Sequence, residues 1–218
     1  LGAVIFGITL SSLHQSGLGA LFLMAKSKIH PLWYTEFIPL LFLVSSIFAG
    51  ISMIIFEGTI SHRVFHNLID ENGKSSFDEI VFGLAKGAAI SMFVYYFFKL
   101  LVFIHESHWQ HIHGFWGFWY LFEIIGLVLV PCFMFAYGAR HRIIGIIRTA
   151  SILTLLGIVL NRLNISMIAY NWNAAVRYYP SWMEYVVSLA VIFAEIWVFR
   201  WIVTRMPVYE KHTEPAMV

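Results

Sequence analysis

Long apolar stretches are the feature that most constrains how this chain folds. Six of them qualify as membrane spans, at about residues 1–24, 36–58, 79–103, 115–137, 142–162 and 182–204. A helix needs about 20 mainly apolar residues to cross about 30 Å of hydrocarbon. A barrel strand alternates polar and apolar residues, whereas residues 37–44 are apolar throughout. Since only helices and closed barrels satisfy their backbone within lipid, the sequence predicts an all-α polytopic membrane protein with six transmembrane helices.

The composition agrees with this prediction. The 218 residues are 60% hydrophobic and 12% charged, and the mean hydropathy is +0.77. Soluble domains carry about 25% charged residues, so a soluble enzyme or a disordered tail is excluded. A net charge of +2 is too small to favour nucleic acid as a partner. The single cysteine, Cys132, excludes an internal disulfide and a cysteine-ligated iron–sulfur cluster.

Lysine and arginine are divided unequally between the two predicted sides of the membrane. One side, which includes the C-terminal tail at 205–218, carries nine: Arg63, Lys74, Lys86, Arg140, Arg142, Arg148, Arg200, Arg205 and Lys211. The other side carries five: Lys26, Lys28, Lys99, Arg162 and Arg177. Because cytoplasmic loops are enriched in these residues, we expect a cytoplasmic C-terminus. The outer joints hold Trp33, Trp109, Trp116 and Trp172, which we expect at the membrane interface.

Several polar residues lie within the predicted spans, where burial without a partner is costly. Four ionisable ones are candidates for a proton path: Glu57, Lys86, Glu123 and Glu195. A polar group closes the fifth span at its outer end: Asn161, Arg162 and Asn164. The alternatives are that Lys86 extends to the headgroups, and that each glutamate makes one fixed interhelix bond.

Histidines offer two further candidate sites. His14 lies in the outer half of the first span, close to Ser11 and Gln15, and either bonds a neighbouring helix or borders a site. A second group lies in one joint at a spacing that suits metal ligation: His105, His108, His111 and His113. No cysteine completes that group, so we interpret it as a polar aromatic joint. A bilayer haem needs two facing histidines at one depth, and His14 with His105 is the one feasible pair.

A series of short motifs, in order along the chain, carries a family resemblance. They are Ser-Leu-His-Gln-Ser-Gly-Leu-Gly at 12–19, His-Pro-Leu-Trp at 30–33, Ile-Phe-Glu-Gly at 55–58, Asn-Arg-Leu-Asn at 161–164, Ala-Tyr-Asn at 169–171 and Tyr-Pro-Ser-Trp at 179–182. The chain resembles the NrfD/polysulfide reductase membrane subunit family. It is most similar to the branch that includes the membrane subunit of periplasmic nickel–iron hydrogenases.

The resemblance implies a fold of about ten helices in two bundles, of which this sequence is the later part. Residues 1–24 would be the last helix of the quinone-side bundle, and 36–162 would be the second four-helix bundle. Residues 182–204 would be the final transmembrane helix. Four earlier helices are therefore expected before Leu1, where the sequence starts within an apolar run.

The resemblance also implies a function. Family members exchange electrons between a membrane quinone, such as menaquinone, and a periplasmic ferredoxin-like iron–sulfur subunit, and some are proposed to couple this to proton movement. A multihaem cytochrome c or a catalytic subunit such as a hydrogenase would complete the complex in a bacterial or archaeal cytoplasmic membrane, surrounded by lipids. The resemblance implies that this chain binds no haem and no metal, and that His14, Gln15 and Ser11 border the quinone site. A haem b cytochrome and an ion- or proton-conducting transporter are the alternatives.

Overall fold

The computed structural model is helical throughout its regular elements. It describes all residues except 1, 65–70, 171, 175–179 and 206–218, so the predicted tail at 205–218 lies almost wholly outside the described residues. The α-helices are α1 (Gly2–Leu21), α2 (Ile38–Val64), α3 (Glu71–His105), α4 (Phe115–Leu121), α5 (Val130–His141), α6 (Ile144–Leu163) and α7 (Trp182–Arg205). Two π-helical segments extend them: η4 (Phe122–Leu129), which joins α4 to α5, and η5 (Asn164–Ile168), which continues α6.

Five helices of the described chain are long and apolar enough to cross a membrane, and they identify a multi-pass membrane protein. They are Ile38–Ser61, Phe77–His105, Phe115–His141, Ile144–Ile168 and Trp182–Ile202. Each coincides with a span predicted from the sequence. The first predicted span forms α1, which is a 20-residue helix but is not among the five. The sixth span therefore stays a prediction.

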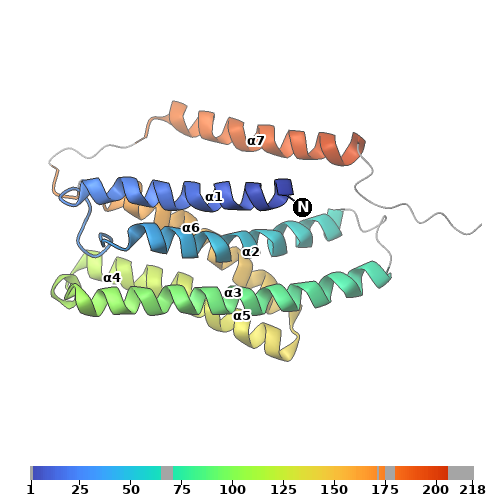
Figure 1. The fold of residues 1–218 in the computed structure, drawn as a ribbon, viewed down its shortest axis with the longest axis horizontal. Coiled ribbons are helices and arrows are strands. Elements are labelled where there is room, and N and C mark those ends of the chain that lie inside the picture. The colour runs from blue at the N-terminus through green and yellow to red at the C-terminus, as the bar shows by residue number, and fades with distance from the viewer. Residues whose placement is uncertain (1, 65–70, 171, 175–179, 206–218) are drawn as a thin grey trace, which may run out of the picture. The chain divides into compact units, whose positions relative to one another are not determined.

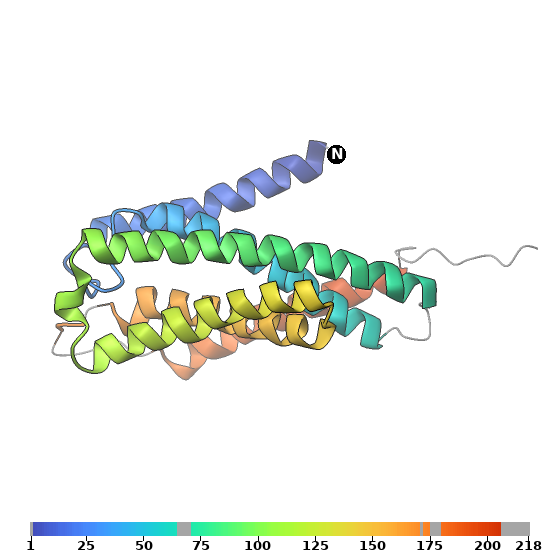
Figure 2. The same cartoon turned by 90° about the horizontal axis from the view of Figure 1, so that it is seen from below.

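Four antiparallel helices form a closed ring of neighbours within residues 1–175. α2 packs on α3, α3 on α5, α5 on α6, and α6 returns to α2 (Figure 1). α1 packs along α2, and its N-terminal end diverges from the bundle (Figure 2). Short joints between successive helices make this up-and-down order the simplest arrangement.

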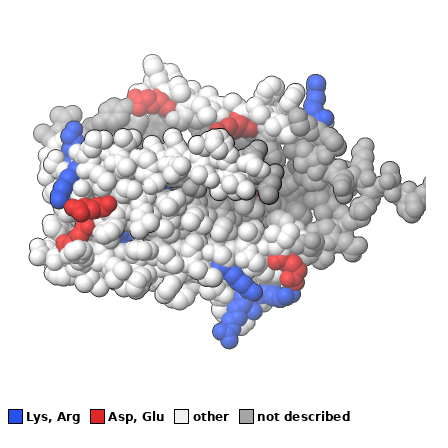
Figure 3. All heavy atoms as spheres, in the orientation of Figure 1, with Lys and Arg blue, Asp and Glu red and all other residues white. Residues whose placement is uncertain are grey.

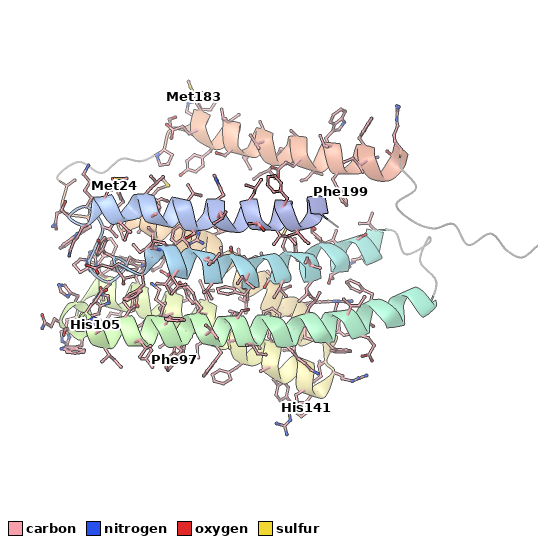
Figure 4. All side chains as sticks on the ribbon, viewed as in Figure 1. Met24, Phe97, His105, His141, Met183 and Phe199 are labelled. Atoms are coloured by element: carbon pink, nitrogen blue, oxygen red, sulfur yellow. The ribbon has the colours of Figure 1, made fainter. Side chains whose placement is uncertain are left out.

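The middle of the ring is filled by apolar side chains. Small residues of α3, Ala85 and Ala88, face large ones such as Phe48 and Phe135, all at most 2% exposed. Small residues let the backbones of neighbouring helices approach closely. Such packing matters in a membrane because lipid provides no hydrophobic driving force for helix association. Outward side chains such as Phe97 are apolar and exposed (Figure 4). On the face shown in Figure 3, the charged side chains of this unit lie mostly toward its ends.

The joint between α1 and α2 is tied to the end of α6. Ile29 and Tyr170 form an antiparallel bridge, and the His30 backbone N–H donates to the Ala169 carbonyl at 2.9 Å. These bonds hold the segment that carries His30 and Trp33 over one end of the ring. A second buried cluster, rich in aromatic side chains, lies there. Trp33 and Leu32 belong to it, and each is 1% exposed.

Residues 176–218 form a separate unit, whose described helix is α7. The Ser181 hydroxyl donates to the Glu184 carboxylate at 3.1 Å at the start of this helix. Glu195 lies midway along α7 and is exposed.

Candidate functional site

A buried carboxylate is the centre of the polar groups in the bundle. Glu123, in η4, is 1% exposed. Its Oε2 accepts hydrogen bonds from Trp33 Nε1 at 2.7 Å and from Asn164 Nδ2, and its Oε1 accepts one from Asn161 Nδ2. Trp33 was expected at the membrane interface, but it points into the bundle because its joint is tied down at Ala169. The residues Glu123, Asn161 and Asn164, which the sequence marked separately, are therefore one network.

π-Helical backbone places two members of this network. Glu123 lies in η4 and Asn164 lies in η5, on neighbouring helices. Pro131 follows η4 and has no N–H to offer the Leu127 carbonyl, which disfavours a regular α-helix across Leu127 to Pro131. π-Segments are rare and concentrate at functional sites, so their coincidence with the polar network marks it as a candidate site.

Arg162 extends the network toward α2. Its guanidinium donates to Ser45 Oγ at 2.8 Å and to Asn161 Oδ1 at 3.3 Å. Its Cζ lies 3.4 Å from the ring centroid of Phe42, a cation–π contact. Because Asn161 bonds both Arg162 and Glu123, a buried acid and a base are joined through one amide.

A cavity of about 540 Å³ lies beside this arginine, between α1, α2 and α6. It is lined by Ser11, Gln15, Leu18, Phe22, Phe42, Ser46, Ala49, Ile158, Arg162 and Ser166. Two of the three residues expected to border a quinone site, Ser11 and Gln15, line it. The third, His14, is on the same helix with an exposed side chain.

A second polar group leads from the bundle to the joint after α3. Lys99 is 4% exposed, and its charge interacts with both Glu123 and Glu106. Glu106 accepts a hydrogen bond from Thr35 Oγ1 at 2.7 Å and pairs with His108 Nε2 at 3.1 Å. Charged and hydroxyl side chains thus continue from Glu123 to the end of the bundle.

His30 is buried among aromatic rings at this same end. Its ring centroid lies 4.6 Å from that of Trp172 and 5.2 Å from that of Trp116. Burial, and then the nearby His111 and His108, lower the pKa of His30 from 6.5 to about 4. Burial likewise lowers the pKa of His108, although Glu106 opposes the shift.

The other predicted residues lie apart from this network. Glu57 on α2 and Lys86 on α3 are exposed, and Glu195 belongs to the separate unit of α7. Within the described ranges, no three histidine, cysteine or acidic side chains are grouped as metal ligands. Figure 4 shows His105 at the end of the bundle where Met24 lies, well away from His141.

Sequence reasoning missed three participants: Trp33, Lys99 and Glu106. Lys99 was assigned to the outer side by charge counting, although its apolar neighbours Phe97, Phe98, Leu100 and Leu101 signal a place inside the span. Nothing local in the sequence indicates the contact of Trp33 with Glu123, since 90 residues separate them.

The fold and the network define a class: a multi-pass helical membrane protein with a charged network buried at one end of a bundle. The chain belongs to the polysulphide reductase NrfD family, whose profile matches residues 3–175. This confirms the family predicted from the motifs, and it makes the chain a membrane subunit of the NrfD type.

Two relatives are similar over nearly all of the chain. A protein of Nitratidesulfovibrio vulgaris is 44% identical over 212 residues, which are 96% of this chain and 55% of that protein. The probable Ni/Fe-hydrogenase 2 b-type cytochrome subunit of Escherichia coli is 26% identical over 207 residues, which are 94% of this chain and 52% of that subunit. The chain therefore spans about half the length of both. No solved structure matches it.

Proposed function

We propose that this chain is the quinone-interacting part of a membrane subunit in a respiratory oxidoreductase. It exchanges electrons between menaquinone or another quinone and an iron–sulfur subunit on the periplasmic side, and it is not catalytic alone. Membership of the NrfD family and the name of the hydrogenase relative support this proposal. The single observation that carries it is the cavity beside Arg162, into which residues of the predicted quinone border project.

The chemistry of the cavity suits a quinone ring. Phe22, Phe42 and Leu18 supply apolar walls, and Arg162 and Gln15 supply hydrogen-bond donors for carbonyl oxygens. Its volume of about 540 Å³ falls within the usual range of small-molecule sites. A quinone supplies two-electron, two-proton redox chemistry, which the protein residues serve by orienting the ring and handling protons.

Partners follow from the same proposal. A periplasmic ferredoxin-like iron–sulfur subunit receives or supplies the electrons, and a hydrogenase-type catalytic subunit or a multihaem cytochrome c completes the chain of carriers. The relative named as a hydrogenase 2 subunit favours the hydrogenase class. The setting is a cytoplasmic membrane with the C-terminal tail inside.

Proton movement is the second part of the proposal. The candidates named from the sequence were Glu57, Lys86, Glu123 and Glu195, and Glu123 is the one within the buried network. An ionisable residue within a span marks proton or ion pathways more often than a purely structural bond. Arg162 connects this network to the cavity, so protons exchanged by a quinone there would have a charged group beside them.

A haem b cytochrome is the alternative that a specific observation favours, because the hydrogenase relative is named a b-type cytochrome subunit. His14 and His105 would have to be its ligands. An absorption spectrum of the purified complex separates the two functions. If this chain binds haem b, the parent complex shows a haem b band that is lost in His14→Ala. The proposal expects no such loss. Transport is tested by the list of co-purifying subunits, since a transporter needs no iron–sulfur partner.

The test replaces two residues of the predicted quinone border in the intact complex. In Gln15→Leu and His14→Ala we expect slower quinone-linked turnover, with electron transfer among the partner subunits unchanged. His141→Ala, an exposed histidine remote from the cavity, is the matched control. Normal quinone-linked turnover in both Gln15→Leu and His14→Ala would refute the proposed site.

A further inference from the structure

Glu123 is held by hydrogen bonds that all run in one direction. Its three partners are all donors, from Trp33, Asn161 and Asn164. The two amides cannot be turned around, because Asn164 Oδ1 accepts from Trp119 Nε1 at 3.0 Å and Asn161 Oδ1 accepts from Arg162. A carboxylate suits three donors, whereas a protonated acid would aim its own O–H at one of them. Glu123 is therefore poorly placed to pick up and release a proton.

Lys99 is a neighbouring charged group that is better placed to pick up and release a proton. It is 4% exposed, and its Nζ lies 5.8 Å from the ring centroid of Tyr120. Burial acts most strongly against its charge, the carboxylates Glu123 and Glu106 favour the charge, and Arg162 opposes it. Lys99 and Glu106 are seven residues apart, which is about two helical turns. Glu106 directly follows α3, and its N–H still donates to the Val102 carbonyl at 2.9 Å, so the helical register places the two residues on the same side. A lysine with a flexible stem and two carboxylates that act on its charge has two directions in which to hold its ammonium group.

Glu106 connects this lysine to the end of the bundle. Its side chain is 27% exposed, so it reaches water, and it bonds Thr35 and His108. The other ring nitrogen of His108, Nδ1, is buried and has no hydrogen-bond partner among the described residues. Glu106 is therefore the member of this pair that lies where the network meets water.

We propose that Lys99 is the proton-carrying residue of the buried network, and that Glu123 is its permanent counter-anion. The Lys99 ammonium gives one proton to the Glu106 carboxylate, which leaves a neutral amine beside Glu123. Glu106 then releases that proton to outer water. The amine takes its next proton from the cavity side, where oxidation of a quinol releases protons, and quinone reduction runs the steps in reverse. This inference rests on the proposed function for the source of the protons.

The test compares two lysines of α3 in the complete complex, reconstituted in vesicles. Lys99→Met removes the titrating group, and Lys99→Arg keeps a positive charge that does not deprotonate, which protects assembly around Glu123. We expect both variants to lose proton movement per electron. Lys86→Met, an exposed position on the same helix, should keep the parental ratio. The parental ratio in either assembled Lys99 variant would overturn the proposal.

An infrared measurement tests the assignment without quinone chemistry. Difference spectra between about pH 5 and about pH 9 detect carboxylic acids that gain or lose a proton. The proposal predicts that no carboxyl signal of the parent complex is lost in Glu123→Gln. A signal that disappears in Glu123→Gln would overturn the role of a fixed anion. This result does not depend on turnover, so it separates failure of the Lys99 assignment from failure of the proposed function.

Discussion

Trp33 and Glu123 illustrate what burial demands of single residues. A charged oxygen without donors would be costly within the membrane, and three N–H groups meet that demand for Glu123. Trp33 itself is 1% exposed, and its ring packs edge-on against Tyr120 at 5.5 Å. Its indole N–H needs an acceptor once it is buried, so the two residues satisfy one another.

The pKa of His30 predicts a dependence of stability on pH. Burial and the neighbouring histidines lower this pKa from 6.5 to about 4, so between these values the unfolded chain binds more protons than the folded chain. Stability is then fully present above about pH 6.5 and falls as the pH drops toward about 4. We expect the thermal midpoint in detergent to fall between about pH 7.5 and about pH 5, and to fall less in His30→Gln.

The control for this experiment is His141→Gln, because His141 is exposed. A residual fall is expected in His30→Gln, since burial lowers the pKa of His108 as well. An equal fall in the parent and in His30→Gln would contradict the buried, neutral state of His30.

At the scale of helices, the spans were predictable and their irregularities were not. The five described spans coincide with five of the six predicted apolar stretches, because length and hydropathy alone decide what crosses a bilayer. The π-segments at Glu123 and Asn164 depend on the neighbouring chain, and a single sequence carries only the signal of Pro131. The joint at 26–37 pairs with residues after α6, a long-range contact that periodicity does not reveal.

The contact between η4 and α6 gives a prediction about a single glycine. A Cβ at Gly157 would lie 2.8 Å from both the Cβ and the carbonyl oxygen of Leu127. Gly157→Ala should therefore force the helices apart and cost about 1–3 kcal/mol. In contrast, nothing lies within 4 Å of a Cβ at Gly145 on the same helix, so Gly145→Ala should be neutral or stabilising by about 0.5–1 kcal/mol.

The measurement is the thermal midpoint of both glycine variants in detergent, followed by the amount of protein that remains monodisperse. A lower midpoint only in Gly157→Ala would support the close contact between η4 and α6. Equal midpoints for the two variants would show that the contact is looser than the structure gives it.

At the scale of the whole molecule, the chain combines a cavity with a line of charged groups. Ser11 and Gln15 reach the cavity from α1, and Arg162 joins it to Glu123. Glu123 and Glu106 both act on the charge of the buried Lys99. The sequence predicted which polar residues matter on α1 and α6, because polar groups stand out in apolar helices. It did not predict which of them meet, because that depends on how the helices of the ring face each other.

The most direct test of the quinone-interacting function is covalent labelling with a photoreactive quinone analogue. The complete complex is illuminated with the analogue, and the labelled peptides are identified by mass spectrometry with and without excess natural quinone. We predict labelling around Phe22, which directly follows α1, and around Phe42 of α2. The competitor should suppress this labelling, and Gln15→Leu should reduce it. Labelling that the natural quinone does not displace, or that avoids every residue lining the cavity, would contradict a quinone site in this chain.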